Sequence, residues 1–290
     1  MIVTRDRRSS LVETLARLRA LPERPPLVVV DNGSTDGTTA EVRERWPEVT
    51  LVSLASNLGA AGRTAGVRAA RTPFVAFSDD DSWWEPGALA HAGRLLAETP
   101  RLGLVAARVM VRPAGGDPTQ DREDPVCAAM TAGPRSTAVP DGHDVLGFLA
   151  CGAVVRRDAY LSVGGFHPRY GIGGEEELLA LDLTAAGWRC CHVPAVVAVH
   201  SPDSTRARPG RRRREVRNAL WTAWLRRRPA GLVRRSLDVL GTGWTSPQTL
   251  AGLGAAVAGL PWVLGERAAV DRATEAWRSM LDRQPRHAPR

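Results

Sequence analysis

Three consecutive carboxylates, Asp79, Asp80 and Asp81, carry the clearest chemical signal in this 290-residue chain. An apolar run with strand character, residues 74–77, precedes them with only Ser78 between, and no basic residue lies among them. Because like charges this close repel one another, a bound cation would stabilise the cluster. Mg²⁺ and Mn²⁺ bind one or two carboxylates together with the phosphate oxygens of a substrate. The run therefore predicts a metal and diphosphate site at the end of a strand, the alternative being an acidic surface turn.

A second acidic run, Glu175, Glu176 and Glu177, opens an apolar helical segment that is followed by Gly187. Acidic residues are common in a first helical turn because they oppose the helix dipole, and that is the structural interpretation. Residues 171–174, just before the run, include three glycines, which would let a ligand approach the backbone closely. The glycines therefore favour a functional interpretation of this run over the structural one.

The elements that must position these carboxylates alternate along the first half of the chain. Short apolar runs predict strands, and the segments between them have helical periodicity. The expected strands cover residues 2–5, 27–30, 49–54 and 74–77. Such alternation is typical of βαβ units and a mostly parallel sheet, whose ligands bind at the carboxyl ends of the strands. Asp31 and Asp79 both stand at such ends, as a nucleotide site requires.

The composition narrows the class of protein. All 39 basic residues are Arg, so the net charge of +8 partly reflects coding bias, and we expect no nucleic-acid partner because no recognition motif accompanies it. The four cysteines form no CxxC pair, which argues against a zinc cluster or a disulfide framework and fits a reducing cytoplasm. Without a signal peptide or an apolar segment of ~20 residues, the chain is expected to be soluble or peripheral. The first strand begins almost at Met1, which leaves open whether residues precede it.

Several motifs in the chain resemble those of one enzyme family. Residues 28–38, VVVDNGSTDGT, closely resemble the nucleotide-binding signature of family 2 glycosyltransferases, which have the GT-A fold. The later matches follow in the family's order over roughly residues 1–228. They are "N-x-G…R-N-x-G" at 57–66, "DxD" at 79–81, and "GGF…ED" at 164–166 and 174–176. The chain departs from the family with Thr64 in place of Asn and Glu176 in place of Asp.

The resemblance implies an α/β fold of GT-A type, with a doubly wound, mostly parallel sheet and flanking helices. We expect residues 1–203 to form the catalytic domain, with a nucleotide-binding half at about 1–111 and an acceptor half at about 112–203. Five prolines in 112–144 predict a long irregular loop there. Residues 204–290 are expected to form a basic, amphipathic helical extension. That extension either packs on the core or in a homodimer contact, or rests peripherally on the inner face of a membrane.

The implied activity is metal-dependent, inverting transfer of a hexosyl or deoxyhexosyl group from a nucleotide-diphosphate sugar to an acceptor hydroxyl. Asp79, Asp81 and His200 would bind Mn²⁺ or Mg²⁺, although His200 at a strand end also has a purely structural interpretation. Glu176 aligns with the catalytic base, and Glu175 is the alternative. The expected donor-nucleotide site comprises Thr4, Arg5, Asp31, Asn32, Gly33, Asn57, Arg63, Asp79 and Asp80. The expected acceptor-binding residues are Trp83, Trp84 and Gly174.

The acceptor stays open among a lipid-linked glycan, a cell-wall polymer and a small natural product. Two other functions also stay open. A nucleotide-sugar-binding protein without catalysis would agree with the Asp-to-Glu change at Glu176. A nucleotidyltransferase of similar fold would need a glycine-rich phosphate loop after the first strand, and residues 4–8 contain no glycine.

Overall fold

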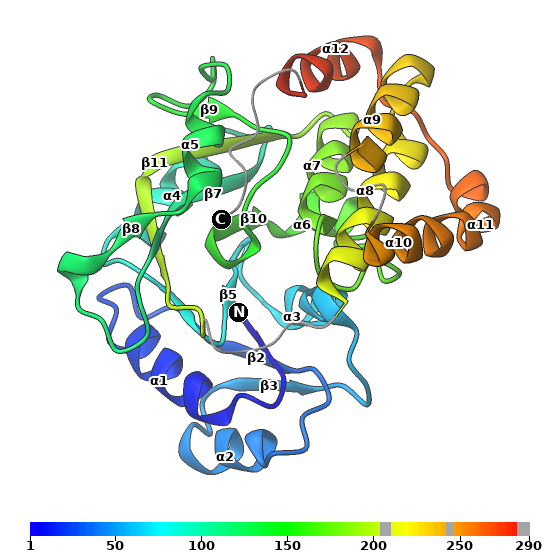
Figure 1. The fold of residues 1–290 in the computed structure, drawn as a ribbon. Helices are drawn as coiled ribbons and strands as arrows, with labels where there is room; N and C mark the ends of the chain where they lie inside the picture. The colour runs from blue at the N-terminus through cyan, green and yellow to red at the C-terminus, as the bar shows by residue number, and fades with distance from the viewer. Residues whose placement is uncertain (204–209, 242–245, 283–290) are drawn as a thin grey trace.

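The structure, a computed structural model, describes residues 1–203, 210–241 and 246–282. A four-stranded parallel sheet in the order β3-β2-β1-β5 forms one half of its core (Figure 1). Its strands are β1 (Ile2–Thr4), β2 (Val28–Asp31), β3 (Thr50–Ser53) and β5 (Ser78–Asp79). The register pairs Thr4 with Asp31 and Val3 with Asp79, so the polar strand ends meet at one edge. The expected parallel sheet is confirmed.

A second sheet, in the order β4-β10-β7-β11-β6, is mainly antiparallel, and only β7 and β11 run parallel. Its strands are β4 (Phe74–Ala76), β6 (Ser82–Trp84), β7 (Leu102–Val111), β10 (Ala153–Arg156) and β11 (Arg189–His200), with short β8 (Arg122–Glu123) and β9 (His143–Asp144) beside them. The expected strand 74–77 divides at Phe77, because β4 belongs to the second sheet and β5 to the first. The acidic run therefore lies where the two sheets meet.

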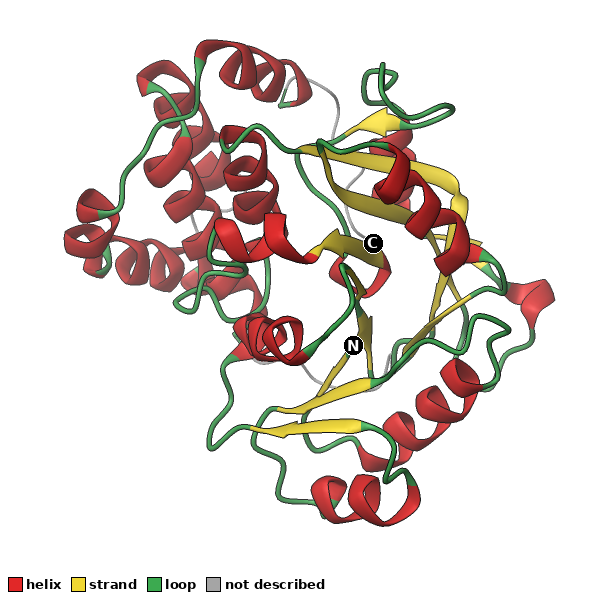
Figure 2. Ribbon diagram, turned by 180° about the vertical axis from the view of Figure 1, so that it is seen from behind, coloured by secondary structure: helices red, strands yellow, loops and turns green. Residues whose placement is uncertain are grey.

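Helices cover the sheets and bury the apolar faces that their sequences present (Figure 2). Helix α1 buries Leu11, Leu15 and Leu18, at the spacing of one helical face. Helix α3 packs closely on β2, since a Cβ on Gly66 would lie 2.8 Å from the Val30 side chain. The helices of this part are α1 (Arg8–Arg19), α2 (Thr38–Arg45), α3 (Gly62–Ala69), α4 (Ala88–Glu98), α6 (Arg157–Ser162) and α7 (Glu175–Ala185), with 3-10 turns η1 (Gly59–Ala61) and η3 (Ala150–Gly152).

The segment 112–144 is more ordered than an irregular loop. It contains η2 (Pro118–Gln120), β8, α5 (Pro125–Thr131) and β9. Helix α5 begins where Asp124 accepts a hydrogen bond from the Val126 N–H and Pro125 takes the first helical position. This proline starts a helix instead of marking a loop, which corrects the expectation.

The C-terminal region is helical, as expected, and gathers on one side of the molecule next to α7 (Figure 1). Its helices are α8 (Arg211–Arg226), α9 (Pro229–Gly241), α10 (Pro247–Ala258), α11 (Leu260–Gly265) and α12 (Arg272–Leu281). Leu178 of α7 shares a hydrophobic cluster with Leu220 and Trp221 of α8. The domain boundary near residue 203 stays a prediction. In the described part, every helix is too short or too polar to cross a membrane.

Candidate active site

The first acidic triplet consists of Asp79, which ends β5, and of Asp80 and Asp81, which form the tight turn before β6. Two arginines from other elements reach this triplet. Arg63 of α3 forms an ion pair with Asp79. Arg7, just after β1, contacts both neighbours, with Nε 3.0 Å from Asp80 Oδ1 and a terminal nitrogen 2.9 Å from Asp81 Oδ2. The triplet is therefore largely neutralised within the protein, so charge repulsion alone does not require a metal.

Asp80 stabilises the turn through buried hydrogen bonds. It is buried, and its Oδ2 accepts a hydrogen bond of 2.9 Å from the Thr4 hydroxyl, while its backbone carbonyl accepts bonds from Ser10 and Thr14. Burial raises the pKa of Asp80 to about 7, with Arg7 opposing the shift and the two neighbouring carboxylates adding to it. Thr4 and Asp80, both expected to contact the nucleotide, thus bind each other and fix the turn.

Asp81 lies beside His200 at the end of β11, where His200 is paired with Ser82 across the sheet. His200 Nε2 is 3.3 Å from Asp81 Oδ1. Burial lowers the pKa of His200, but the hydrogen bond and charge of Asp81 outweigh it and raise that pKa. Burial likewise raises the pKa of Asp81, while His200 and Arg7 outweigh it and hold that pKa below its usual range. The fold thus brings together Asp81 and His200, two of the three predicted metal ligands, while the third, Asp79, pairs with Arg63, and metal binding stays a prediction.

A divalent metal fits the pair Asp81 and His200. A carboxylate oxygen and an imidazole nitrogen are suitable Mn²⁺ ligands, and such ions commonly take their remaining ligands from water and phosphate. The described residues contain no group of three or more His, Cys, Asp and Glu able to hold a metal by themselves. Binding would also require Arg7 to release Asp81. Any metal here would thus depend on oxygen ligands from a substrate.

The predicted nucleotide loops converge at the same sheet edge. Asp31 is buried and accepts hydrogen bonds from the Ser34 N–H and the Thr39 hydroxyl. Asn32 bridges to the next loop, donating to the Gly59 carbonyl at 3.0 Å and accepting from the Leu58 N–H at 2.9 Å.

Other residues predicted for the nucleotide site differ in their positions. Gly33 has φ +79°, and the Asn57 side chain accepts a bond from the Gly59 N–H, so both shape this loop. Arg5 is exposed and pairs with Asp6 instead of reaching the acidic triplet.

Glu175, Glu176 and Glu177, the second acidic triplet, begin α7 after Gly174, whose φ of +87° suits only glycine well. The three side chains have different surroundings. Glu175 is buried and accepts a hydrogen bond from the Gly173 N–H. Glu177 forms ion pairs with Arg278 at 3.2 Å and Arg235 at 3.9 Å. Glu176 has no hydrogen bond or ion pair to any other residue in the described ranges.

The surroundings of Glu176 shift the pKa of its carboxyl group. Burial, followed by the charge of Glu175, raises the pKa of Glu176 to about 8, with Arg63 opposing the shift. Burial also raises the pKa of Glu175, which Arg63 and the Gly173 N–H partly offset. A carboxyl group with a pKa near neutral is suited to accept a proton during catalysis.

Arg63 connects the two acidic triplets. It is 5% exposed, and although burial lowers its pKa, the charges of Asp79, Glu175 and Glu176 outweigh burial and raise it. The loops also touch, because the Ala60 N–H donates to the Gly171 carbonyl at 2.9 Å. The fold therefore brings the two runs of carboxylates, which are far apart in the sequence, to one arginine.

Two residues at the site were missed from the sequence. Arg7 stands at the carboxyl end of β1, so the rule that placed Asp31 and Asp79 also indicates it. Asn218 of α8 is fully buried and donates to the Gly173 carbonyl at 2.6 Å and the Tyr170 carbonyl at 3.0 Å. Its polar side chain on the apolar face of α8 was the available signal. Asn218 holds the glycine loop that precedes Glu175.

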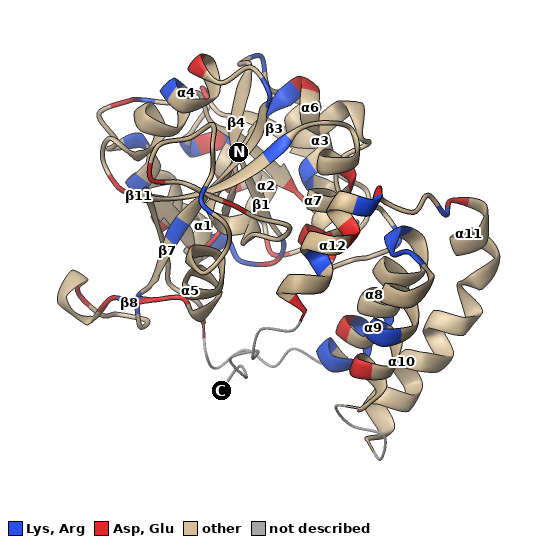
Figure 3. Ribbon diagram, turned by 90° about the horizontal axis from the view of Figure 1, so that it is seen from above, with Lys and Arg blue, Asp and Glu red and all other residues tan. Residues whose placement is uncertain are grey.

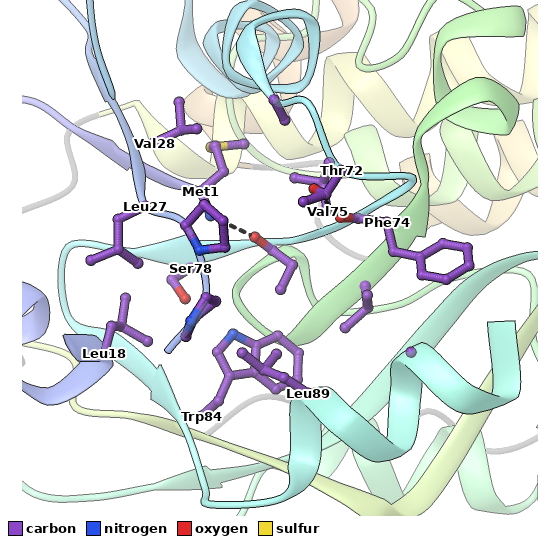
Figure 4. A pocket seen from close by; sticks show the side chains of 16 residues that line it. Met1, Leu18, Leu27, Val28, Thr72, Phe74, Val75, Ser78, Trp84 and Leu89 are labelled. Atoms are coloured by element: carbon purple, nitrogen blue, oxygen red, sulfur yellow. Dashed lines mark hydrogen bonds between the residues drawn. The ribbon is translucent and has the colours of Figure 1, made fainter. Parts of the chain in front are cut away.

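Trp83 and Trp84 belong to the core and not to the acceptor site. Both are buried in the hydrophobic cluster under α1 and α4, and Arg17 lies over the Trp83 ring at 4.2 Å from its centroid. Trp84 lines an apolar cavity of about 190 Å³ together with Met1 and Val28 (Figure 4). Met1 directly precedes β1 and Val28 begins β2, whereas the acidic triplet begins at the end of β5. The expectation that these tryptophans bind the acceptor is therefore corrected, because β6 directs them inward.

Comparison with known proteins agrees with this geometry. The sequence profile of glycosyl transferase family 2 matches residues 1–163. N-acetylglucosaminyl-diphospho-decaprenol L-rhamnosyltransferase of Mycobacterium tuberculosis is 31% identical over 215 residues, covering 64% of this chain and 70% of that protein. Pre-mycofactocin glycosyltransferase of the same organism is 28% identical over 207 residues, covering 69% of this chain and 42% of that protein. Mannosyltransferase PcManGT from Pyrobaculum calidifontis, solved with GDP-Man and Mn²⁺, has a TM-score of 0.59 at 21% identity, covering 97% of this chain and 82% of that one.

The fold and its structural neighbours define a GT-A type glycosyltransferase, so the expected fold class is confirmed. The family profile covers more than half of the chain, and the match to the rhamnosyltransferase covers more than two thirds of that relative. The chain belongs to glycosyl transferase family 2.

Proposed function

We propose that this chain is an inverting hexosyl- or deoxyhexosyltransferase that uses a nucleotide-diphosphate sugar, with Glu176 as its general base. The observation that carries the proposal is the position of Arg63. This buried arginine pairs with Asp79 of the first acidic triplet and interacts electrostatically with Glu175 and Glu176 of the second. A donor bound at the first triplet would present its sugar toward the second.

The donor side is built to hold a nucleotide diphosphate. Asp31 and the loop around Asn32 and Gly33 would receive the nucleoside at the carboxyl ends of β1 and β2. Arg7 and Arg63 would turn from the carboxylates toward the diphosphate, since guanidinium groups bind phosphate oxygens with paired hydrogen bonds. Asp81 and His200 would hold a Mn²⁺ or Mg²⁺ ion, which when bound would stabilise the negative charge of the leaving diphosphate.

The acceptor side supplies the base. Glu176 takes the proton of the acceptor hydroxyl as its oxygen bonds to the anomeric carbon, and the bond from that carbon to the diphosphate oxygen breaks. The nucleotide diphosphate leaves with the bonding electrons, so the configuration inverts in this single displacement. Glu175 keeps the pKa of Glu176 high, and Asn218 fixes the loop through Gly173.

The acceptor that we propose is a lipid-linked glycan. The support is the M. tuberculosis relative, a rhamnosyltransferase whose name gives a sugar on diphospho-decaprenol as its acceptor. The four cysteines are all free and buried, which supports our proposal of a cytoplasmic location.

Calorimetric titration with GDP-, UDP- and dTDP-sugars, each with Mn²⁺ and with EDTA, tests the donor class. We expect one nucleotide class to bind and to bind more tightly with Mn²⁺. Incubating that donor with short-chain lipid-linked glycans should then yield a product whose anomeric proton NMR coupling shows inversion. Tight binding without transfer to any acceptor would instead support a nucleotide-sugar-binding protein, and failure of every nucleotide sugar to bind would overturn the proposal.

A further inference from the structure

The surplus positive charge of this chain lies in its C-terminal region. Residues 204–290 contain 18 Arg against 6 Asp and Glu, whereas residues 1–203 contain 21 Arg against 25 Asp and Glu. Coding bias toward Arg acts on both regions, so it does not explain why only one of them is strongly basic. The difference indicates a partner of negative charge for the C-terminal region.

Helices α10 and α11 stand out within this basic region because no charged residue occurs from 247 to 265. The inner faces of both helices pack closely on α8. A Cβ on Gly252 would lie 2.8 Å from the Val216 side chain, and one on Gly259 would lie 2.6 Å from the Trp221 ring. These two glycines therefore allow α10 and α11 to pack closely on α8.

The outer face of the same helices is apolar and open. Leu250, Val257 and Leu264 repeat every seven residues and are 51%, 50% and 67% exposed. The positions between them on the exposed side are also uncharged, namely Ala251, Gly254, Ala258 and Pro261. A row of exposed large apolar side chains marks an interaction surface.

Arginines border this apolar face. The first turn of α8 carries Arg211, Arg212, Arg213 and Arg214, and α10 crosses it so closely that a Cβ on Gly252 would lie 2.8 Å from the Arg213 carbonyl. Figure 3 shows α10 free of charged residues beside the basic turns of α8 and α9. An apolar strip with an arginine border matches the boundary between acyl chains and anionic headgroups.

We propose that the outer face of α10 and α11, with the first turn of α8, is a docking surface for an anionic membrane. The helices lie in the plane of the interface, where Leu250, Val257 and Leu264 enter the acyl boundary and the arginines contact headgroup phosphates. Neither helix needs to cross the bilayer, in keeping with their lengths of 12 and 6 residues. The inference rests on this surface alone and does not require the proposed chemistry.

Flotation of the full chain with vesicles tests the proposal. We expect the protein to float with vesicles of phosphatidylcholine and phosphatidylglycerol at low salt and much less with phosphatidylcholine alone. The double variant Leu250→Asp/Val257→Asp should reduce the bound fraction about tenfold or more, and Arg211→Ser/Arg213→Ser should reduce binding at low salt and remove its salt dependence. Val126→Asp is the matched control, because Val126 is an exposed apolar residue (41%) on α5, outside this surface.

Circular dichroism and calorimetric binding of the donor nucleotide accompany each variant, so that loss of folding is separated from loss of docking. Failure of the wild-type protein to float, or equal flotation of Leu250→Asp/Val257→Asp and Val126→Asp, overturns the proposal. A wild-type dimer that the same double variant converts to a monomer, without any vesicle binding, would show that a second copy covers the face and would also overturn it.

Discussion

The two acidic triplets resemble each other in the sequence, but the structure surrounds them in opposite ways. Asp79 and Asp81 of the first triplet are paired with Arg63, Arg7 and His200. In the second triplet, Glu176 stands without a partner among the described residues, and its pKa rises to about 8. Under the proposed function, the first triplet would hold ligands, whereas the second would keep one carboxyl group able to exchange a proton.

This difference shows that the sequence of a carboxylate run does not reveal its chemical role until the positive charges around it are known. Arg63 serves both triplets, but it pairs directly only with Asp79. Burial near an arginine that is already paired leaves Glu176 with the cost of desolvation and little compensation, which is why its pKa rises.

The largest effect is expected from the second triplet. Glu176→Gln keeps the shape of the side chain and removes its basicity, so turnover should fall by ~10²–10⁴-fold with donor affinity nearly unchanged. Turnover is measured under donor saturation, and affinity by calorimetry. Normal turnover of Glu176→Gln together with an inactive Glu175→Gln would move the base by one residue.

A change in the first triplet should act on binding. Asp81→Asn removes the negative charge that would hold a metal beside His200, so the affinity gained from Mn²⁺ should fall by at least ~10–100-fold. Calorimetric titration of the nucleotide with Mn²⁺ and with EDTA measures this gain. If the wild-type protein binds the nucleotide equally under both conditions, Arg7 and Arg63 neutralise the diphosphate alone and the metal is not needed.

The smallest effect is expected at Glu177, which provides the matched control within the second triplet. Its carboxylate is paired with Arg278 and Arg235, so Glu177→Gln should leave turnover within about twofold. Its unfolding free energy should fall by about 1 kcal/mol, measured by urea denaturation. A loss of turnover as large as that of Glu176→Gln would break the distinction between the three glutamates.

Local patterns in the sequence predicted the parallel sheet and indicated that both acidic triplets belong to a functional site, because strand periodicity and strand ends are local features. The ion pairs that Arg7 and Arg63 form with the aspartates were not predictable, because they arise only through the tertiary fold. The sequence indicates both arginines as site residues, Arg63 through the family motif and Arg7 through its place after β1. Trp83 and Trp84 were misassigned since neighbouring polar residues gave no indication that β6 turns inward. Pro125 misled in the same way, because a proline that starts a helix and one in a loop look alike without Asp124 as the cap.

The dependence of kcat/KM on pH tests the central claim most directly, because it reports the protonation of Glu176 in the free enzyme. Only the deprotonated base is active, so kcat/KM should rise about tenfold per pH unit and level off above about pH 8. Among the described residues, Glu175, Arg63 and Asp79 are the charged groups with the largest effect on the pKa of Glu176. Glu175→Gln removes the negative neighbour that raises this pKa, so the rise should move to lower pH, while Glu177→Gln should leave it in place. A profile that is flat from about pH 6 to pH 9, or one that Glu175→Gln does not move, would contradict the assignment of Glu176 as the base.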